Sequence, residues 1–289
     1  GAIYLDAENG LVNEFNITVC VFKNNYATYD STFYLSSTEN SAIIISDCVF
    51  NENRGGKNII YSRAQNLKVQ DLAFEFPDIN TNARPLCLGS DSRTEVSNVQ
   101  FIKCSMNDEE GTAIKAEENS QLIDVHNCKF IDGKSTGSSV EIYASTALFH
   151  DNEFTSSSYT KSGLYIYGSS HIEVVDCSFS KLSSQEAIRS PLYIDSQNLN
   201  IKLITENLIF SDCRGDNLRC FSVKARADFS FFNVTVQDNK EGNYLGAIER
   251  KNINGATFTF ENCTWRNNNC NSKYGGGSVT SSTATATNG

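Results

Sequence analysis

The sequence predicts an all-β fold, a right-handed parallel β-helix of about ten coils in which the chain winds repeatedly around one apolar column. Two observations predict this fold. A degenerate repeat of about 27 residues runs along nearly the whole chain, and one column of that repeat is almost always Asn or Asp. One aromatic or apolar residue marks each coil, and we name its position the anchor. The anchors are Phe22, Phe50, Phe74, Phe101, Phe130, Phe154, Phe179, Phe210, Val236 and Trp265.

The residues before each anchor predict two strands joined by a bend. Positions two, five and seven before the anchor are mostly apolar, and the odd step from five to two requires a bend if all of them are to face inward. The position three before the anchor, which we name the bend column, is Asn or Asp in nine of ten coils. These residues tolerate left-handed backbone. The column reads Val19, Asp47, Asp71, Asn98, Asn127, Asp151, Asp176, Asn207, Asn233 and Asn262.

A third strand precedes this pair in each coil, as in Ile114–Ala116 and Leu164–Ile166, with its outer two residues facing in and its middle residue facing out. Three strands per coil predict three parallel sheets. A β-sandwich, the other all-β option, gives no reason for a fixed Asn/Asp column. We assign one domain to residues 1–274, and residues 275–289 to the start of a further coil or a Ser/Thr-rich linker.

Neither end of the chain has a sequence typical of a cap. Residues 1–5 already read as an ordinary strand, and residues 275–281 read as the start of another coil. Because open β-helix ends invite further strands, we expect a longer parent protein or end-to-end stacking of copies into a filament.

Composition narrows the range of partners and locations. The formal net charge is −10 and Lys and Arg do not cluster, so nucleic acid is not expected as a partner. No apolar run is long enough to predict a membrane span. Ten cysteines and three glycosylation sequons, at Asn16, Asn233 and Asn262, indicate an extracellular or cell-surface location.

Nine of the ten cysteines fall into two groups. Cys20, Cys48, Cys128, Cys177 and Cys263 lie two before their anchors, where they face inward as small apolar residues. Cys20 and Cys48 are within reach of each other, although their parallel side chains are poorly aimed for a bridge. We expect possible disulfides between Cys213 and Cys220, which flank one turn, and between Cys87 and Cys104 within one coil.

Several short motifs carry a resemblance to known surface proteins. Residues 111–114 and 246–248, with 22–25 and 50–53, resemble the GGAI and FxxN repeats of the polymorphic outer-membrane protein family. Residues 47–50 and 176–179, which read Asp-Cys-x-Phe, are similar to repeats in large surface proteins of single-celled eukaryotes. The resemblance implies a pectin-lyase-like β-helix with a surface or adhesive role.

Many β-helices of this kind cleave acidic polysaccharides, and such enzymes carry recognisable catalytic motifs. The polygalacturonase motifs Asn-Thr-Asp, Asp-Asp, Gly-His-Gly and Arg-Ile-Lys do not occur. The stacked acidic pairs, Asp47 with Asp71 and Asp151 with Asp176, lie in the bend column, where Asn replaces Asp freely. Arg84, Arg93, Arg189 and Arg250 lie on distant coils, and the stacked His126 and His150 are too few for a metal site.

These observations predict no catalytic residue, no metal and no cofactor. The leading hypothesis is a non-catalytic extracellular structural or adhesive solenoid that binds copies of itself, other surface proteins or glycans. Outward Tyr4 and Tyr34, and outward Tyr165 and Tyr193, form a candidate glycan-contact face, although such ladders also stabilise sheets. The alternative is a polysaccharide-degrading enzyme, which a groove gathering several acidic residues with an arginine would favour.

Overall fold

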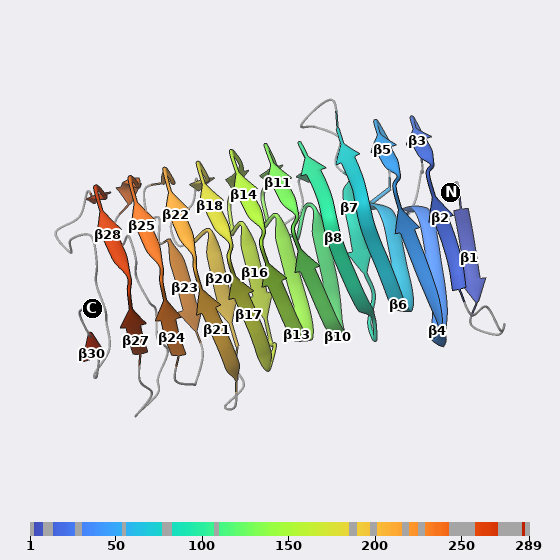
Figure 1. Cartoon of the computed structure of the whole chain (residues 1–289). Helices are drawn as coiled ribbons and strands as arrows, with labels where there is room; N and C mark the ends of the chain where they lie inside the picture. Colours follow the sequence, from blue (N-terminus) through green and yellow to red (C-terminus); the bar gives the residue numbers. More distant parts are fainter. Residues whose placement is uncertain are drawn as a thin grey trace.

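The computed structural model describes residues 3–7, 14–26, 31–53, 56–76, 83–106, 110–184, 190–196, 201–215, 220–224, 229–242, 258–270 and 285–286. Every regular element in these residues is a β-strand, and their named pairings are all parallel. Successive coils stack along one axis from β1 at the N-terminal end to β28 at the other (Figure 1). The predicted parallel β-helix is confirmed. No helix among the described residues has the length and apolarity of a membrane span.

The coils form three main walls. The first wall contains β1 (Ile3–Ala7), β7 (Arg84–Leu88), β16 (Leu164–Tyr167), β20 (Leu192–Asp195), β23 (Phe221–Lys224) and the starts of the long strands β4 (Ser31–Ser46), β6 (Asn58–Glu75), β10 (Ile114–His126) and β13 (Val140–His150). The long strands then run into the second wall, which also contains β2 (Glu14–Thr18), β8 (Arg93–Ile102), β17 (His171–Val175), β21 (Lys202–Glu206), β24 (Phe229–Phe232), β27 (Phe258–Glu261) and β30 (Thr285–Ala286).

The third wall carries the anchors. It contains β3 (Val21–Lys23), β5 (Val49–Asn51), the ends of β6 and β8, β11 (Lys129–Ile131), β14 (Glu153–Thr155), β18 (Ser178–Ser180), β22 (Ile209–Ser211), β25 (Thr235–Gln237) and β28 (Thr264–Arg266). All ten anchors are in register from Phe22 to Trp265. Eight of these ten strands have a neighbour on both sides among the described residues, so the enclosed solenoid is slightly shorter than the expected ten coils.

The bend column behaves as predicted. All ten of its residues have a positive φ between 53° and 55°, including Val19, the one member that is neither Asn nor Asp. Asp47, Asp71, Asp151 and Asp176 are exposed at these bends, which agrees with their interpretation as turn formers.

A second bend was not predicted. Two residues after the anchor, nine coils again have a positive φ, in residues as different as Glu52, Lys103 and Ser156. This bend opens a short fourth wall made of β9 (Ser105–Met106), β12 (Lys134–Ser135), β15 (Ser158–Tyr159), β19 (Ser183–Ser184), β26 (Lys240–Gly242) and β29 (Asn269–Cys270). The expectation of three sheets is therefore incomplete.

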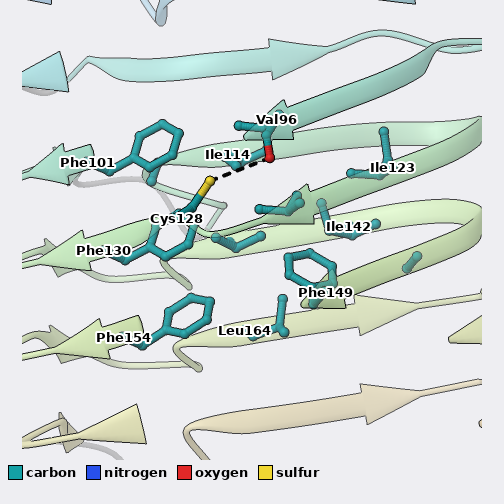
Figure 2. Packing of buried hydrophobic residues seen from close by; sticks show 14 of the residues in the cluster. Val96, Phe101, Ile114, Ile123, Cys128, Phe130, Ile142, Phe149, Phe154 and Leu164 are labelled. Carbon is teal, nitrogen blue, oxygen red and sulfur yellow. Dashed lines mark hydrogen bonds between the residues drawn. The ribbon is translucent and has the colours of Figure 1, made fainter. Parts of the chain in front are cut away.

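The interior is a continuous apolar column in which the anchors stack as aromatic rings. Phe101, Phe130 and Phe154 lie one above another with ring centroids 4.9 and 4.5 Å apart (Figure 2). Such offset stacking adds roughly 0.5–1.5 kcal/mol per pair to the burial of the rings. The three rings are at most 1% exposed.

The residue directly after each bend points inward, and where it is polar it bonds the preceding coil. Asn152 accepts a hydrogen bond from the backbone N of Cys128 (3.0 Å) and donates to the carbonyl of Val125 (2.8 Å). The same pair of contacts is made by the residue directly after the second bend where that residue is Asn53, Asn239 or Asn268. The thiol of Cys128 donates to the carbonyl of Val96 at 3.5 Å, as Figure 2 shows. These side chains satisfy backbone groups that the bends leave unpaired.

The expected disulfides are absent. The nine described cysteines are free thiols, and the side chain of Cys270 lies outside the described residues. Cys213 and Cys220 are both buried in the core cluster, and the thiol of Cys213 contacts the carbonyls of Phe179 and Ser211, both at 3.5 Å. Cys104 also belongs to the core, whereas the thiol of Cys87 lies outside the first wall, 4.0 Å from Glu117. The wall therefore separates these two sulfur atoms.

The three sequon asparagines are exposed. Asn16 lies on the outer face of β2, and Asn233 and Asn262 lie at consecutive bends. The amide of Asn233 donates to Asn207 at 2.7 Å, within a ladder that also includes Asp176. Their glycosylation stays a prediction.

Candidate functional site

The outer face of the first wall carries one unbroken column of outward side chains. The register stacks the middle residues of successive strands in the order Tyr4, Tyr34, Tyr61, Cys87, Lys115, Glu141, Tyr165, Tyr193 and Ser222. The predicted pairs are brought together: the rings of Tyr4 and Tyr34 stack at 5.0 Å, and those of Tyr165 and Tyr193 lie 5.1 Å apart. We name this column and the outward residues beside it the tyrosine–glutamate face.

The structure places three further tyrosines on this face and shows that several of its outward residues are buried. Tyr61 continues the first ladder at 5.8 Å from Tyr34, and Tyr143 and Tyr167 lie beside Tyr165 in a second outward column. Tyr193 is only 8% exposed, so the expectation that it contacts a glycan is not supported by its position. Cys87, Glu141 and Ser222 are also buried despite facing outward.

A groove of about 450 Å³ interrupts the face between the two tyrosine groups. That volume is within the usual range for small-ligand sites. The groove is lined by Ser90, Glu110, Lys115, Glu117, Glu118, Asn119, Glu141 and Tyr143. None of these four glutamates lies at an anchor or in the bend column. The run Glu117-Glu118-Asn119, which interrupts the strand pattern of its coil, is the signal that could have found them.

Arg84 lies behind the groove and is only 1% exposed. Its guanidinium donates to Asn58 Oδ1 at 2.9 Å and to the carbonyl of Gly111, and contacts Glu110 Oε2 at 3.1 Å. Lys115 Nζ lies 2.7 Å from the other oxygen of Glu110. Burial alone would raise the pKa of Glu110, but Lys115 and Arg84 outweigh it and hold that pKa below its ordinary value. One arginine, Arg84, therefore lies against an acidic residue of this groove.

Glu141 lines the groove and is only 4% exposed. Its Oε1 accepts a hydrogen bond from the Tyr143 hydroxyl at 2.9 Å, whereas Oε2 has no hydrogen-bond partner among the described residues. Burial raises the pKa of Glu141, although Tyr143, Lys161 and Lys115 act in the opposite direction. Gly111 makes room for this side chain, since a Cβ there would lie 2.9 Å from Glu141 Cβ.

The outer face of the second wall holds the three histidines. His126 and His150 are in register, as expected, and both are partly exposed. Glu95 lies 3.4 Å from His126, and Glu173 lies 3.5 Å from His150 and 2.7 Å from His171. In the part of the chain that the structure describes, no group of three or more His, Cys, Asp or Glu side chains could hold a metal ion.

Comparison with known proteins gives one match. The family model described as a right-handed β-helix region matches residues 3–181 and 86–251, which together span most of the chain. No curated protein and no solved structure matches the chain.

Proposed function

Because this chain belongs to the right-handed β-helix family, we propose that it is a non-catalytic adhesive solenoid at the cell surface or outside the cell, which binds glycans along the tyrosine–glutamate face. The observation that carries the proposal is the placement of two tyrosine groups on either side of one polar groove. Tyrosine rings stack on the apolar faces of sugars, and the groove offers polar groups to their hydroxyls.

The repeat of the solenoid suits an extended polymer. Successive outward residues are separated by about 4.8 Å, the strand spacing of a parallel sheet. A glycan chain lying along the solenoid axis therefore meets one outward side chain for roughly each sugar ring. Tyr34, Tyr61, Tyr143, Tyr165 and Tyr167 are half-buried, so each has part of its ring available for contact.

The surface location is supported by two observations. The three sequon asparagines are exposed, and the GGAI, FxxN and Asp-Cys-x-Phe motifs resemble those of the polymorphic outer-membrane protein family and related surface proteins. The cysteines do not add to this support, because the described ones are free thiols. Other surface proteins and copies of the same chain remain the alternative partners of such a solenoid.

Binding to immobilised polysaccharides tests the proposal. We expect the protein to be retained by at least one glycan, and the changes Tyr61→Ala and Tyr165→Ala to weaken retention about tenfold each. Tyr26→Ala is the matched control, because Tyr26 is 72% exposed and lies beyond the third wall. Equal retention of all variants would contradict the assignment to this face.

A second candidate function is cleavage of polysaccharides. The groove gathers Glu110, Glu117 and Glu141 in front of Arg84, and carboxyl groups with separated pKa values are what general acid–base catalysis needs. In such a reaction Glu141, with its raised pKa, would be the proton donor. A screen of neutral, amino and uronic acid polymers for released reducing ends tests it. Cleavage that is lost in Glu141→Gln would replace the non-catalytic proposal.

A further inference from the structure

The charges and the unpartnered oxygen of the groove point to one class of glycan. We propose that the groove binds an amino sugar, with the ammonium group of the sugar held by Glu141 and the neighbouring glutamates. This inference rests on the proposed glycan binding and narrows it to a chemical class.

The groove is strongly acidic. Four glutamates line it against one lysine, Lys115, and the buried Arg84 lies behind it. Both cations contact the same carboxylate, that of Glu110. With every glutamate ionised, the set therefore has two more negative than positive charges, and one negative charge remains in excess when Lys161, whose charge also acts on Glu141, is counted. A uronic acid would add a further carboxylate to this set, whereas an ammonium group would reduce the repulsion within it.

The burial of Glu141 is a second observation that favours an ammonium ligand, independent of the charge count. Its carboxyl is more than nine-tenths buried, it lines the groove, and its Oε2 accepts no hydrogen bond in the described residues. A buried acceptor without a donor is costly. A sugar hydroxyl would supply a donor without charge, but an ammonium group supplies both a donor and the compensating charge.

The surroundings of Glu141 favour a sugar as the carrier of that ammonium. Tyr143 donates to Glu141 Oε1, and its ring lies 6.3 Å from that of Tyr165, which is the outward neighbour of Glu141 on the next coil. Tyr61 lies on the other side of the groove, with its hydroxyl 3.5 Å from Glu117. A glycan chain whose amino group reaches Glu141 therefore meets Tyr165 one coil away in one direction and Tyr61 three coils away in the other.

Isothermal titration of the whole chain tests the inference with four probes at pH 6: a glucosamine hexasaccharide, its uncharged N-acetylated form, a galacturonate hexasaccharide and a hexalysine peptide. We expect the glucosamine probe to bind at least about tenfold more tightly than each of the others. Glu141→Gln should lower its affinity by about tenfold or more, because Gln keeps the shape but not the charge. Glu153→Gln, on the outer face of β14, is the matched control that should leave the affinity unchanged.

Each outcome decides between the proposals. Tighter binding of galacturonate or of the N-acetylated probe would overturn the amino-sugar inference and leave glycan binding standing. Equal binding of hexalysine would show a site for cations that does not recognise sugar. Unchanged affinity in Glu141→Gln, with its thermal unfolding showing a folded protein, would remove Glu141 from the site. Failure of all three sugars to bind would overturn the inference, and failure in the polysaccharide retention assay as well would overturn the proposed function.

Discussion

The first and second walls both carry acidic and basic side chains, but they place them in opposite surroundings. On the second wall, Lys68 and Glu95 pair at 3.0 Å with 40% and 38% of their side chains exposed. On the first wall, Arg84 is 1% exposed and Glu141 is 4% exposed. Water screens the first pair, whereas the protein itself must compensate the charges of the second set. The comparison indicates that the buried charges of the first wall lower the stability of the fold, as is common at functional sites.

The largest expected effect is the loss of the buried guanidinium. Arg84→Met leaves the carbonyl of Gly111 and the amide oxygen of Asn58 without their donor, and we expect it to destabilise the fold by about 3–5 kcal/mol. Lys68→Met on the second wall should cost less than about 1 kcal/mol. Urea unfolding of both variants measures the difference. Equal losses would show that burial does not separate the two walls.

Glu141 and Glu95 should respond to pH with opposite sign. The native state raises the pKa of Glu141 through burial, so its carboxyl costs stability at neutral pH and that cost vanishes below the ordinary glutamate pKa. Glu141→Gln should therefore stabilise the protein by on the order of 1 kcal/mol at pH 7 and have no such effect in acid. Unfolding free energies of this variant from pH 7 to pH 4 measure the trend.

Glu95 provides the control for that experiment. Burial alone would raise its pKa, but Lys68 and His126 lower it overall. Its stabilising contribution is present above the ordinary glutamate pKa and is lost as the pH falls through the native one. Because Glu95 is partly exposed, Glu95→Gln should destabilise by less than about 1 kcal/mol at pH 7. Parallel pH profiles for the two variants would contradict the comparison.

A smaller effect on the free energy of unfolding is expected at an exposed bend, because backbone conformation and not burial determines it there. Val19 is 81% exposed with φ at 54°, a conformation that β-branched residues disfavour. Val19→Asn should stabilise the first coil by about 0.5–1 kcal/mol. Thermal unfolding measures the gain, and Asn98→Val is the reverse change, which should cost at least as much because Asn98 also donates to Asp71 Oδ1 at 2.9 Å. A neutral result for both would mean that residue type does not matter at the bends.

The smallest expected signal concerns the interior thiols. Burial raises the pKa values of Cys128, Cys177 and Cys213 to about 12, so at pH 8 almost none is ionised. We expect these three to resist iodoacetamide in the native protein and to react fully after unfolding, as measured by peptide mass spectrometry. A non-reducing peptide map that shows any of them in a disulfide would contradict the structure.

The sequence predicted the features that recur at one position on every coil. The anchors and the bend column were found because Phe, Asn and Asp repeat there. The second bend was missed because its column is mixed. Five of its nine residues are Asn or Asp and the other four are Glu, Lys or Ser, since a single residue of another type can adopt left-handed backbone at modest cost.

The groove was missed for a different reason. Arg84 and Glu110 are separated by a full coil in sequence, and only the stacking of β7 on β10 brings them together. The loop-like run at Glu117 follows no repeat position. Non-periodic residues such as these are invisible to an argument from period alone, and they are the residues that give this face its chemistry.

The inward residues after the bends give the molecule a direction. Asn53, Asn152, Asn239 and Asn268 each use both ends of the amide to bond the coil before them. In each case the later coil supplies the side chain that bonds main-chain groups of the earlier coil, and Asn25 and Asn239 of the earlier coil also donate from their side-chain amides. The two ends of the solenoid are thus chemically unlike, in the way that the plus and minus ends of a polar filament are unlike. A coil that is added on the C-terminal side therefore finds main-chain donors and acceptors already in place on the coil before it. Its asparagine bonds to those groups and so fixes the position of the new coil along the axis.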